Sequence, residues 1–278
     1  MGLHPGVLGT GNAYLGAAFA GVIKVNSRHA EIITRIRMLR TLTLTMVKRA
    51  KNVKVLFGLN AISAWLGFGG SFIVNTFDLV PEGEIEPHLF GPHAPGMSGA
   101  LTRMIDLFGY FTIWSNLLVA VTITMLYLNP GRSSQRFKLF RNTSLLMILM
   151  TGILYHLLIA PTANPESWNV YTNAFQHYIT PAITVFVWLL VGPRKWFNFR
   201  MTISVFAIPT AYLIYTFARG AIIDRYPYGF FDVIEYGYIS VGTTLVMIYV
   251  AGYVLALLFL ALDKEQVRFA RRGGSSVG

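Results

Sequence analysis

The sequence RSSQRFKLFRNTSLLMILMTGILYHLLIAP, residues 132–161, decides the fold of this chain. It opens with a basic segment and continues over 143–161 as an apolar run without a charged residue. A helix rises about 1.5 Å per residue, so this run is close to the length needed to cross ~30 Å of hydrocarbon. In lipid a helix also satisfies its own backbone amides. The stretch therefore predicts a transmembrane helix that carries a basic flank.

Five further apolar stretches have the same character, so the sequence predicts six membrane spans. Hydrophobic residues make up 54% of the chain and charged residues 13%. The charged share is about half the usual ~25%, too little to cover a water-soluble globule of this length. We expect an all-α, polytopic bundle of six transmembrane helices that forms one domain over 53–262. The other five stretches are 53–77, 107–128, 170–192, 201–218 and 236–262.

Lys and Arg fall almost wholly in alternate gaps between the spans. Of the eighteen that follow residue 47, fifteen lie at the start of span one (48–54), between spans two and three, between spans four and five, or after span six, and three lie in the opposite gaps. The positive-inside rule therefore predicts that both termini face the cytoplasm and that the protein is a multi-pass protein of the cell (inner) membrane. The three exceptions are Arg103, Arg219 and Arg225.

The segment 1–52 is predicted to be a basic N-terminal arm. Basic and apolar residues alternate over 24–42 at helical spacing, which favours an amphipathic helix on the membrane surface. Two alternatives stay open: translation begins at Met38 or Met46, or residues 7–25 form a seventh span.

The net charge of +11 points to membrane lipids as partners. Anionic headgroups at the cytoplasmic face attract the basic loops and the basic tail 263–278, so no nucleic-acid partner is needed. The absence of cysteine excludes disulfides and thiolate metal sites. The sequence does not indicate an oligomeric state.

The gap at 78–106 is predicted to be an irregular external loop, with one amphipathic turn leading into span two. Its histidines, His88 and His93, match no compact metal-ligand spacing and are expected to be solvated.

Polar side chains within the spans gather at one depth. Thr112, Asn116, His156 and His177 come from three helices, and all are expected about one to two and a half turns below the external surface. Each costs a few kcal/mol in hydrocarbon unless it faces the bundle interior. We therefore expect a site near that surface. The alternative is that each of these side chains only makes a hydrogen bond within its own helix, because a Thr in a membrane helix often donates to the carbonyl four residues before it.

Four motifs carry a resemblance to a known family. In their order, and with short basic gaps between them, they resemble the six-span bacterial branch of the androgen-induced, FAR-type integral membrane protein family, over about residues 53–262. The motifs are GYFTIWSNLLVA at 109–120, TGILYHLLIAP at 151–161, QHYITPAITVFVWLL at 176–190 and RYPYGFFDVIEYGY at 225–238.

This resemblance implies a hydrolase of fatty-acid esters that needs no cofactor or metal. Animal members use a membrane-embedded threonine as nucleophile and a histidine as base. The matching residues here are Thr112, after an aromatic pair, and His177, ahead of Pro181. His156, within YHLL of the bacterial pattern, is the alternative base. The substrate implied is lipid-like.

Such a reaction needs further groups at the same depth. A neutral imidazole activates the threonine hydroxyl, and donors must stabilise the oxyanion that forms. Asn116 lies four residues after Thr112 on the same helix face and is the expected donor. Pro181 and Pro209 are expected to interrupt spans four and five and open a cavity. The carboxylates that could orient the imidazole are Asp224, Asp232 and Glu235.

Two functions of other classes remain as alternatives. His156 and His177 could ligate a haem or metal between spans three and four. Otherwise the chain is a non-catalytic structural or transport component, in which these polar side chains only pack.

Overall fold

The computed structural model describes residues 52–80 and 86–275, with side chains described as far as Glu265. The described residues from Val53 onward belong to one compact unit. The predicted N-terminal arm, the alternative start sites and the alternative seventh span lie outside the described residues.

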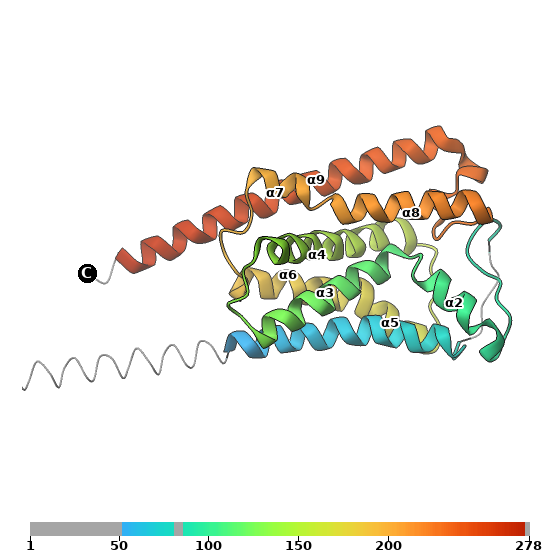
Figure 1. The fold of residues 1–278 in the computed structure, drawn as a ribbon, viewed down its shortest axis with the longest axis horizontal. Coiled ribbons are helices and arrows are strands. Elements are labelled where there is room, and N and C mark those ends of the chain that lie inside the picture. Colours follow the sequence, from blue (N-terminus) through green and yellow to red (C-terminus); the bar gives the residue numbers. More distant parts are fainter. Residues whose placement is uncertain (1–51, 81–85, 276–278) are drawn as a thin grey trace, which may run out of the picture. The chain divides into compact units, whose positions relative to one another are not determined.

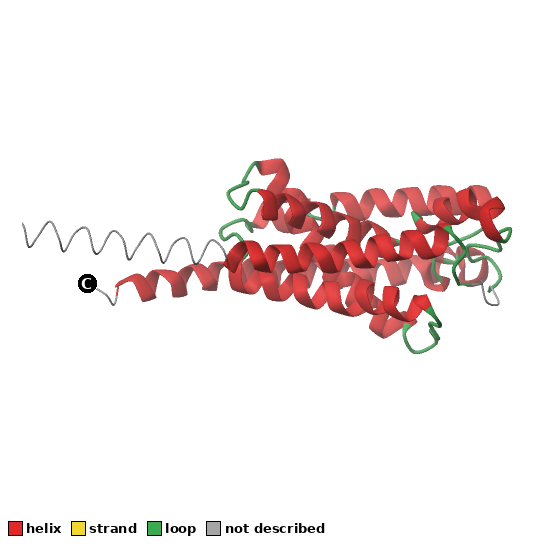
Figure 2. Cartoon of the chain, turned by 90° about the horizontal axis from the view of Figure 1, so that it is seen from below, coloured by secondary structure: helices red, strands yellow, loops and turns green. Residues whose placement is uncertain are grey.

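The prediction of an all-α, six-span fold is confirmed. The described residues contain six helical segments long and apolar enough to cross a membrane, and no strand (Figures 1 and 2). The first is the helix Asn52–Thr76, the second is α3 (Phe111–Leu128), and the third joins α4 (Gln135–Leu154) to the π-helix η2 (Tyr155–Ile159). The fourth joins α5 (Trp168–Ala174), the π-helix η3 (Phe175–Ile179) and α6 (Thr180–Val191). The fifth contains α7 (Phe199–Ser204) and α8 (Ala207–Ile223), and the sixth lies within α9 (Val233–Ser275).

Helix α4 lies at the centre of the bundle, and its span has the largest buried share of the six (Figure 1). Its residue Ile148 packs with Ala64 of the first span and Ile123 of α3 in one core cluster. At the edge of the bundle, α9 exposes apolar side chains such as Val246 and Val250. In a soluble protein an apolar face of this size would be unusual, whereas lipid covers it at no cost.

Several predicted span boundaries differ from the structure, among them those of the third and sixth spans. The third span begins at Gln135 rather than 143, because the basic flank is itself helical and Ser134 accepts a hydrogen bond from the Phe137 amide as the N-cap. The sixth span begins at Val233, but Gly237 has a φ of 74° and interrupts the helix there. Glycine is the residue that adopts this conformation without strain.

Of the two interruptions expected at prolines, the one before Pro209 is present, whereas the fourth span stays helical through Pro181. Pro209 lacks the amide that would bond to the Val205 carbonyl, and α7 and α8 meet at Val205 and Phe206. Pro181 is the second residue of α6, and the π-helix η3 ends two residues before it.

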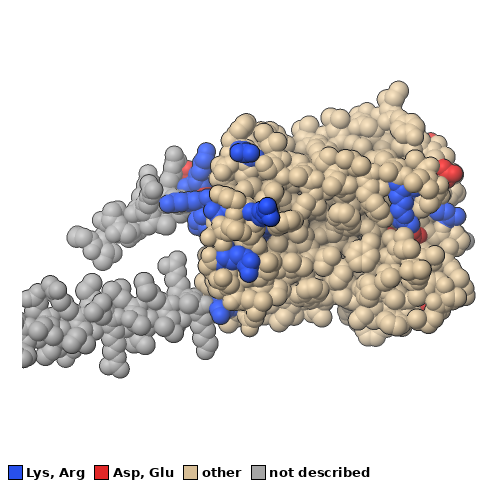
Figure 3. Space-filling model, viewed as in Figure 1, with Lys and Arg blue, Asp and Glu red and all other residues tan. Residues whose placement is uncertain are grey.

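Basic side chains gather at one end of the bundle, which we call the basic end. It contains the loops 129–134 and 192–198, and most of the Lys and Arg visible in Figure 3 lie there. The opposite end carries the connection 86–110 with the 3₁₀-helix η1 (Gly96–Gly99) and the helix α2 (Ala100–Leu107).

The buried Arg103 of α2 fixes this connection to the first span. Its guanidinium donates to the Asn75 carbonyl at 2.7 Å, the Thr76 carbonyl at 3.2 Å and the Ala94 carbonyl at 2.7 Å, and also to the carbonyl of Gly96. Carbonyls at the end of the first span thereby gain a cationic donor. The connection is therefore a folded cap with an amphipathic helix, more ordered than the irregular loop expected.

The expectation that His93 is solvated is wrong. Its Nε2 lies 2.8 Å from Asp106 Oδ2, and the two side chains are 10% and 13% exposed. Asp106 also accepts a hydrogen bond from Arg219 of α8, whose guanidinium lies over the Phe90 ring at 4.3 Å from its centroid. This charged cluster ties the fifth span to the cap.

Candidate active site

Thr112 lies at the start of α3, not one turn inside it as predicted. The helix begins at Phe111 because Tyr110 is extended, with φ −89° and ψ 131°. The turn before it depends on Gly109, where a Cβ atom would lie 2.3 Å from the Phe90 ring. Thr112 is the second residue of α3, so its backbone N–H has no carbonyl acceptor within the helix.

The structure brings Thr112 and His177 together, as the sequence predicted. Thr112 Oγ1 lies 3.2 Å from His177 Nε2, although 65 residues separate them in the chain. His177 Nδ1 lies 2.8 Å from the side-chain oxygen of Asn173 and 3.2 Å from its backbone carbonyl. A carbonyl can only accept, so Nδ1 carries the hydrogen and Nε2 of the neutral ring is the acceptor that faces the hydroxyl. This is the tautomer that a general base for Thr112 requires.

Two π-helical segments position the imidazole. In η3 the Thr180 amide donates to the Phe175 carbonyl, five residues back. Pro181 has no N–H group that could donate to the His177 carbonyl four residues before it. The wider π turn therefore lies where the α-helical hydrogen bonds would be incomplete. The His177 ring stacks on Tyr155, the first residue of η2, with 3.8 Å between centroids and 15° between planes. The ring is therefore held by stacking as well as by hydrogen bonds.

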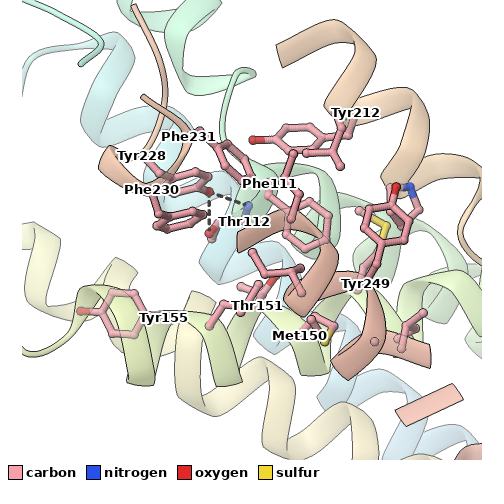
Figure 4. Close-up of a pocket in the computed structure, with 18 of the residues that line it drawn as sticks. Phe111, Thr112, Met150, Thr151, Tyr155, Tyr212, Tyr228, Phe230, Phe231 and Tyr249 are labelled. Carbon is pink, nitrogen blue, oxygen red and sulfur yellow. Dashed lines mark hydrogen bonds between the residues drawn. The ribbon is translucent and has the colours of Figure 1, made fainter. Parts of the chain in front are cut away.

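Tyr228 completes the polar group around Thr112 (Figure 4). Its hydroxyl lies 3.5 Å from Thr112 Oγ1 and accepts a hydrogen bond of 3.4 Å from the Thr112 amide. Two backbone hydrogen bonds hold the loop that carries Tyr228, between α8 and α9. The Phe90 amide donates to the Tyr226 carbonyl at 3.1 Å, and the Tyr226 amide donates to the His88 carbonyl at 2.8 Å. Burial raises the pKa of the Tyr228 hydroxyl from its ordinary value of 10, so it remains a donor at neutral pH.

Thr112 stands at the junction of two cavities. The apolar cavity, of about 70 Å³, lies among α3, α4, α8 and α9, and its lining includes Leu146, Met150 and Leu245 (Figure 4). The polar cavity, of about 430 Å³, contains His177 and reaches the exposed loop residue Asn164. Thr112, Tyr155, Ile159 and Tyr228 line both cavities.

Asn116 does not face the Thr112 hydroxyl. It is fully buried, and its side-chain amide donates to the Thr112 carbonyl at 2.9 Å and to the Gln176 carbonyl at 3.3 Å. Asn116 therefore joins α3 to η3, and in this arrangement its amide is not available as the expected oxyanion donor. The donors that lie beside the Thr112 hydroxyl are the Thr112 amide and the Tyr228 hydroxyl.

None of the three predicted carboxylates bonds to His177 in the structure. Asp232 accepts hydrogen bonds from the amides of Ile234 at 2.9 Å and Glu235 at 3.1 Å, so it caps the start of α9. The orienting group is Asn173, which the sequence reasoning missed. Its position four residues before His177, on the same helix face, is the signal that could have found it.

His156 is separated from Thr112. It is exposed on η2 and lines an apolar groove of about 710 Å³ between α4 and α6, with its ring 6.3 Å from that of Tyr178. Both ring nitrogens of His177 are already engaged, by Thr112 and Asn173. Within 52–80 and 86–275, no three or more His, Cys, Asp or Glu side chains group as metal ligands would. The arrangement favours His177 over His156 as a base.

The fold and the site define a six-span α-helical membrane protein with a Thr–His–Asn arrangement at one end of its bundle. No protein-family model, curated protein or solved structure matches the chain. The function must therefore be inferred from the geometry of the site.

Proposed function

We propose that this protein is a membrane-embedded hydrolase of fatty-acid esters, with Thr112 as nucleophile and His177 as general base. One observation carries the proposal: the Thr112 hydroxyl lies 3.2 Å from the unprotonated nitrogen of an imidazole whose tautomer Asn173 fixes. This is the geometry of an activated hydroxyl with its base and its orienting group, here assembled on two transmembrane segments.

The reaction has two stages. Thr112 Oγ1 attacks the ester carbonyl carbon as His177 Nε2 takes the hydroxyl proton, which gives a tetrahedral intermediate. His177 then returns that proton to the departing alcohol, and an acyl-threonine remains. In the second stage water loses a proton to His177 and attacks the acyl carbon. Collapse of the second tetrahedral intermediate, as His177 returns this proton to Thr112 Oγ1, releases the fatty acid and restores the Thr112 hydroxyl.

The oxyanion has two donors in reach. The Thr112 amide is at the N-terminus of an 18-residue helix, where the backbone dipoles favour negative charge. It bonds to the Tyr228 hydroxyl at 3.4 Å, so the two donors converge beside the nucleophile. A carbonyl oxygen that displaces the tyrosine from this bond would receive both the amide and the hydroxyl hydrogen.

The two cavities support a lipid ester as the substrate. An acyl chain favours the apolar cavity, whereas the alcohol part and the attacking water favour the polar cavity that reaches the loops. Thr112 lies at their junction, where the ester bond of a lipid would be. The resemblance to the androgen-induced, FAR-type family supports the same assignment, because it places the nucleophile at Thr112 and the base at His177.

We further propose that the basic end faces the cytoplasm and that the site lies near the outer surface of the cell (inner) membrane. The charge bias of the loops supports this orientation, with both termini inside. Substrate would then reach Thr112 from the outer leaflet.

The test is labelling of the full chain in membranes by a fluorophosphonate probe, which reacts with activated serine and threonine hydroxyls. We expect Thr112→Ala and His177→Ala to abolish labelling without lowering membrane abundance, and Thr112→Ser to retain it.

Two variants serve as matched controls. Thr243→Ala removes an exposed hydroxyl that bonds only the carbonyl of Ile239 in its own helix, and His156→Ala removes the other candidate imidazole. Both should label like the parent. If Thr112→Ala labels like the parent, the nucleophile is wrong, and a structural or transport component becomes the better description. Loss of labelling in His156→Ala but not in His177→Ala would assign the base to His156.

A further inference from the structure

A second groove runs along α3 on the outer side of the bundle, from Phe108 and Trp114, close in sequence to Thr112, to Arg132 and Arg136 at the basic end. It has a volume of about 760 Å³ and lies between α3 and α4, with Ile208 of α8 along its border. Val121 of α3 and Phe140 of α4 line it and are 40% and 45% exposed. The groove is therefore open toward the hydrocarbon phase and distinct from both cavities of the site.

The apolar part of the groove is long enough for one acyl chain that starts at the basic end. Its wall on α3 extends from Trp114 to Met125. At 1.5 Å per residue this is about 17 Å, close to half of the ~30 Å hydrocarbon core. One extended acyl chain of a leaflet lipid has about this length.

The groove ends in positive charge at the basic end. Arg132, Ser134 and Arg136 line its mouth, and no acidic residue lines any part of it. Both arginines are exposed, and among the described residues neither has a carboxylate within 4.0 Å. The Arg132 guanidinium stands 5.6 Å from the centroid of the Phe137 ring, which also lines the groove.

We propose that this groove binds an anionic glycerophospholipid, with one acyl chain along α3 and the phosphate at Arg132 and Arg136. Guanidinium groups suit phosphate because their paired N–H donors match its oxygens. Basic pockets between transmembrane helices are a recognised setting for anionic headgroups. A zwitterionic lipid would bind less tightly, because the positive charge of its own headgroup would face the two arginines.

The experiment is native mass spectrometry of the purified full chain, titrated with phosphatidylglycerol or with phosphatidylcholine of the same acyl chains. We expect the parent to bind one phosphatidylglycerol at least tenfold more tightly than phosphatidylcholine. The double variant Arg132→Gln/Arg136→Gln should lose at least tenfold in affinity for phosphatidylglycerol.

The matched control Lys195→Gln/Arg200→Gln removes the same charge from two other exposed residues near the basic end, Lys195 in the loop 192–198 and Arg200 in α7. It should change this affinity by no more than about twofold, because it leaves the groove intact. Equal losses in the two double variants would overturn the proposal in favour of diffuse surface attraction.

The apolar half of the groove is tested separately. Val121→Trp fills it and should weaken binding of phosphatidylglycerol, whereas Val250→Trp on the exposed face of α9 should not. If the parent is instead a dimer that Val121→Trp dissociates, a second copy of the chain occupies the groove and the lipid assignment fails.

Discussion

Removal of the Asn173 side chain should slow the reaction of Thr112 without abolishing it. Two acceptors receive the hydrogen of His177 Nδ1, the Asn173 side-chain oxygen at 2.8 Å and its backbone carbonyl at 3.2 Å. Asn173→Ala removes the nearer acceptor and leaves the farther one. The imidazole should therefore keep its tautomer but lose part of its orientation.

The size of the effect follows from that one hydrogen bond. A hydrogen bond contributes about 0.5–1.5 kcal/mol net, and about 1.4 kcal/mol is tenfold in rate. The expected loss is therefore about two- to twelvefold. A reversed tautomer costs about 10⁴-fold in a serine protease, so the backbone carbonyl should prevent the larger loss.

The assay is the second-order rate of fluorophosphonate labelling, measured with the abundance and melting temperature of each variant. Asn173→Asp keeps an acceptor at the same place and should label at least as fast as the parent. A purely structural role for Asn173 would lower the melting temperature and would not be rescued in rate by Asp.

Two results would refute this reasoning. Labelling of Asn173→Ala at the parental rate would show that the side chain does not orient the base. A loss as large as that of His177→Ala, at unchanged abundance, would show that the backbone carbonyl does not hold the tautomer.

Further predictions concern the oxyanion donors and the cap. Tyr228→Phe should slow labelling about 10²-fold at unchanged abundance, because it removes one of two donors; parental rates would remove Tyr228 from the site. Since burial raises the pKa of Tyr228, its hydroxyl should stay protonated as pH rises, and labelling should not decline between about pH 8 and 9.5; a decline that Tyr228→Phe abolishes would contradict this. Asp106→Ala leaves Arg219 unpaired and should destabilise the protein by about 3 kcal/mol, seen as a lower melting temperature, while the exposed Glu86→Gln should have little effect. Gly109→Ala places a Cβ atom against the Phe90 ring and should cost about 1–3 kcal/mol and slow labelling; a stable, fully labelled variant would mean that the turn before α3 is not required.

Only part of the site could be predicted from the sequence. Thr112 and His177 stand out because a polar side chain in an apolar run is rare and costly, and their depths can be counted along each helix. Depth does not give the rotation of a helix about its axis. His156 shares the depth of His177 but points into a lateral groove, and Asn116 shares the face of Thr112 but bonds carbonyls.

The sequence by itself determined the six spans and the basic end. Hydropathy and charge bias are local properties of the chain, and they decide which segments lie in lipid and which loops lie in water. Only the tertiary structure decided the start of α3 at Phe111, the convergence of Tyr228 on Thr112 and the choice of Asn173 as the partner of His177. These features depend on packing between segments distant in sequence, on the turn at Gly109 and on the widened turn before Pro181. Except for Asn173, which lies four residues before His177 in the same span, each is fixed by atoms of another span or loop, so no periodicity within one span encodes it.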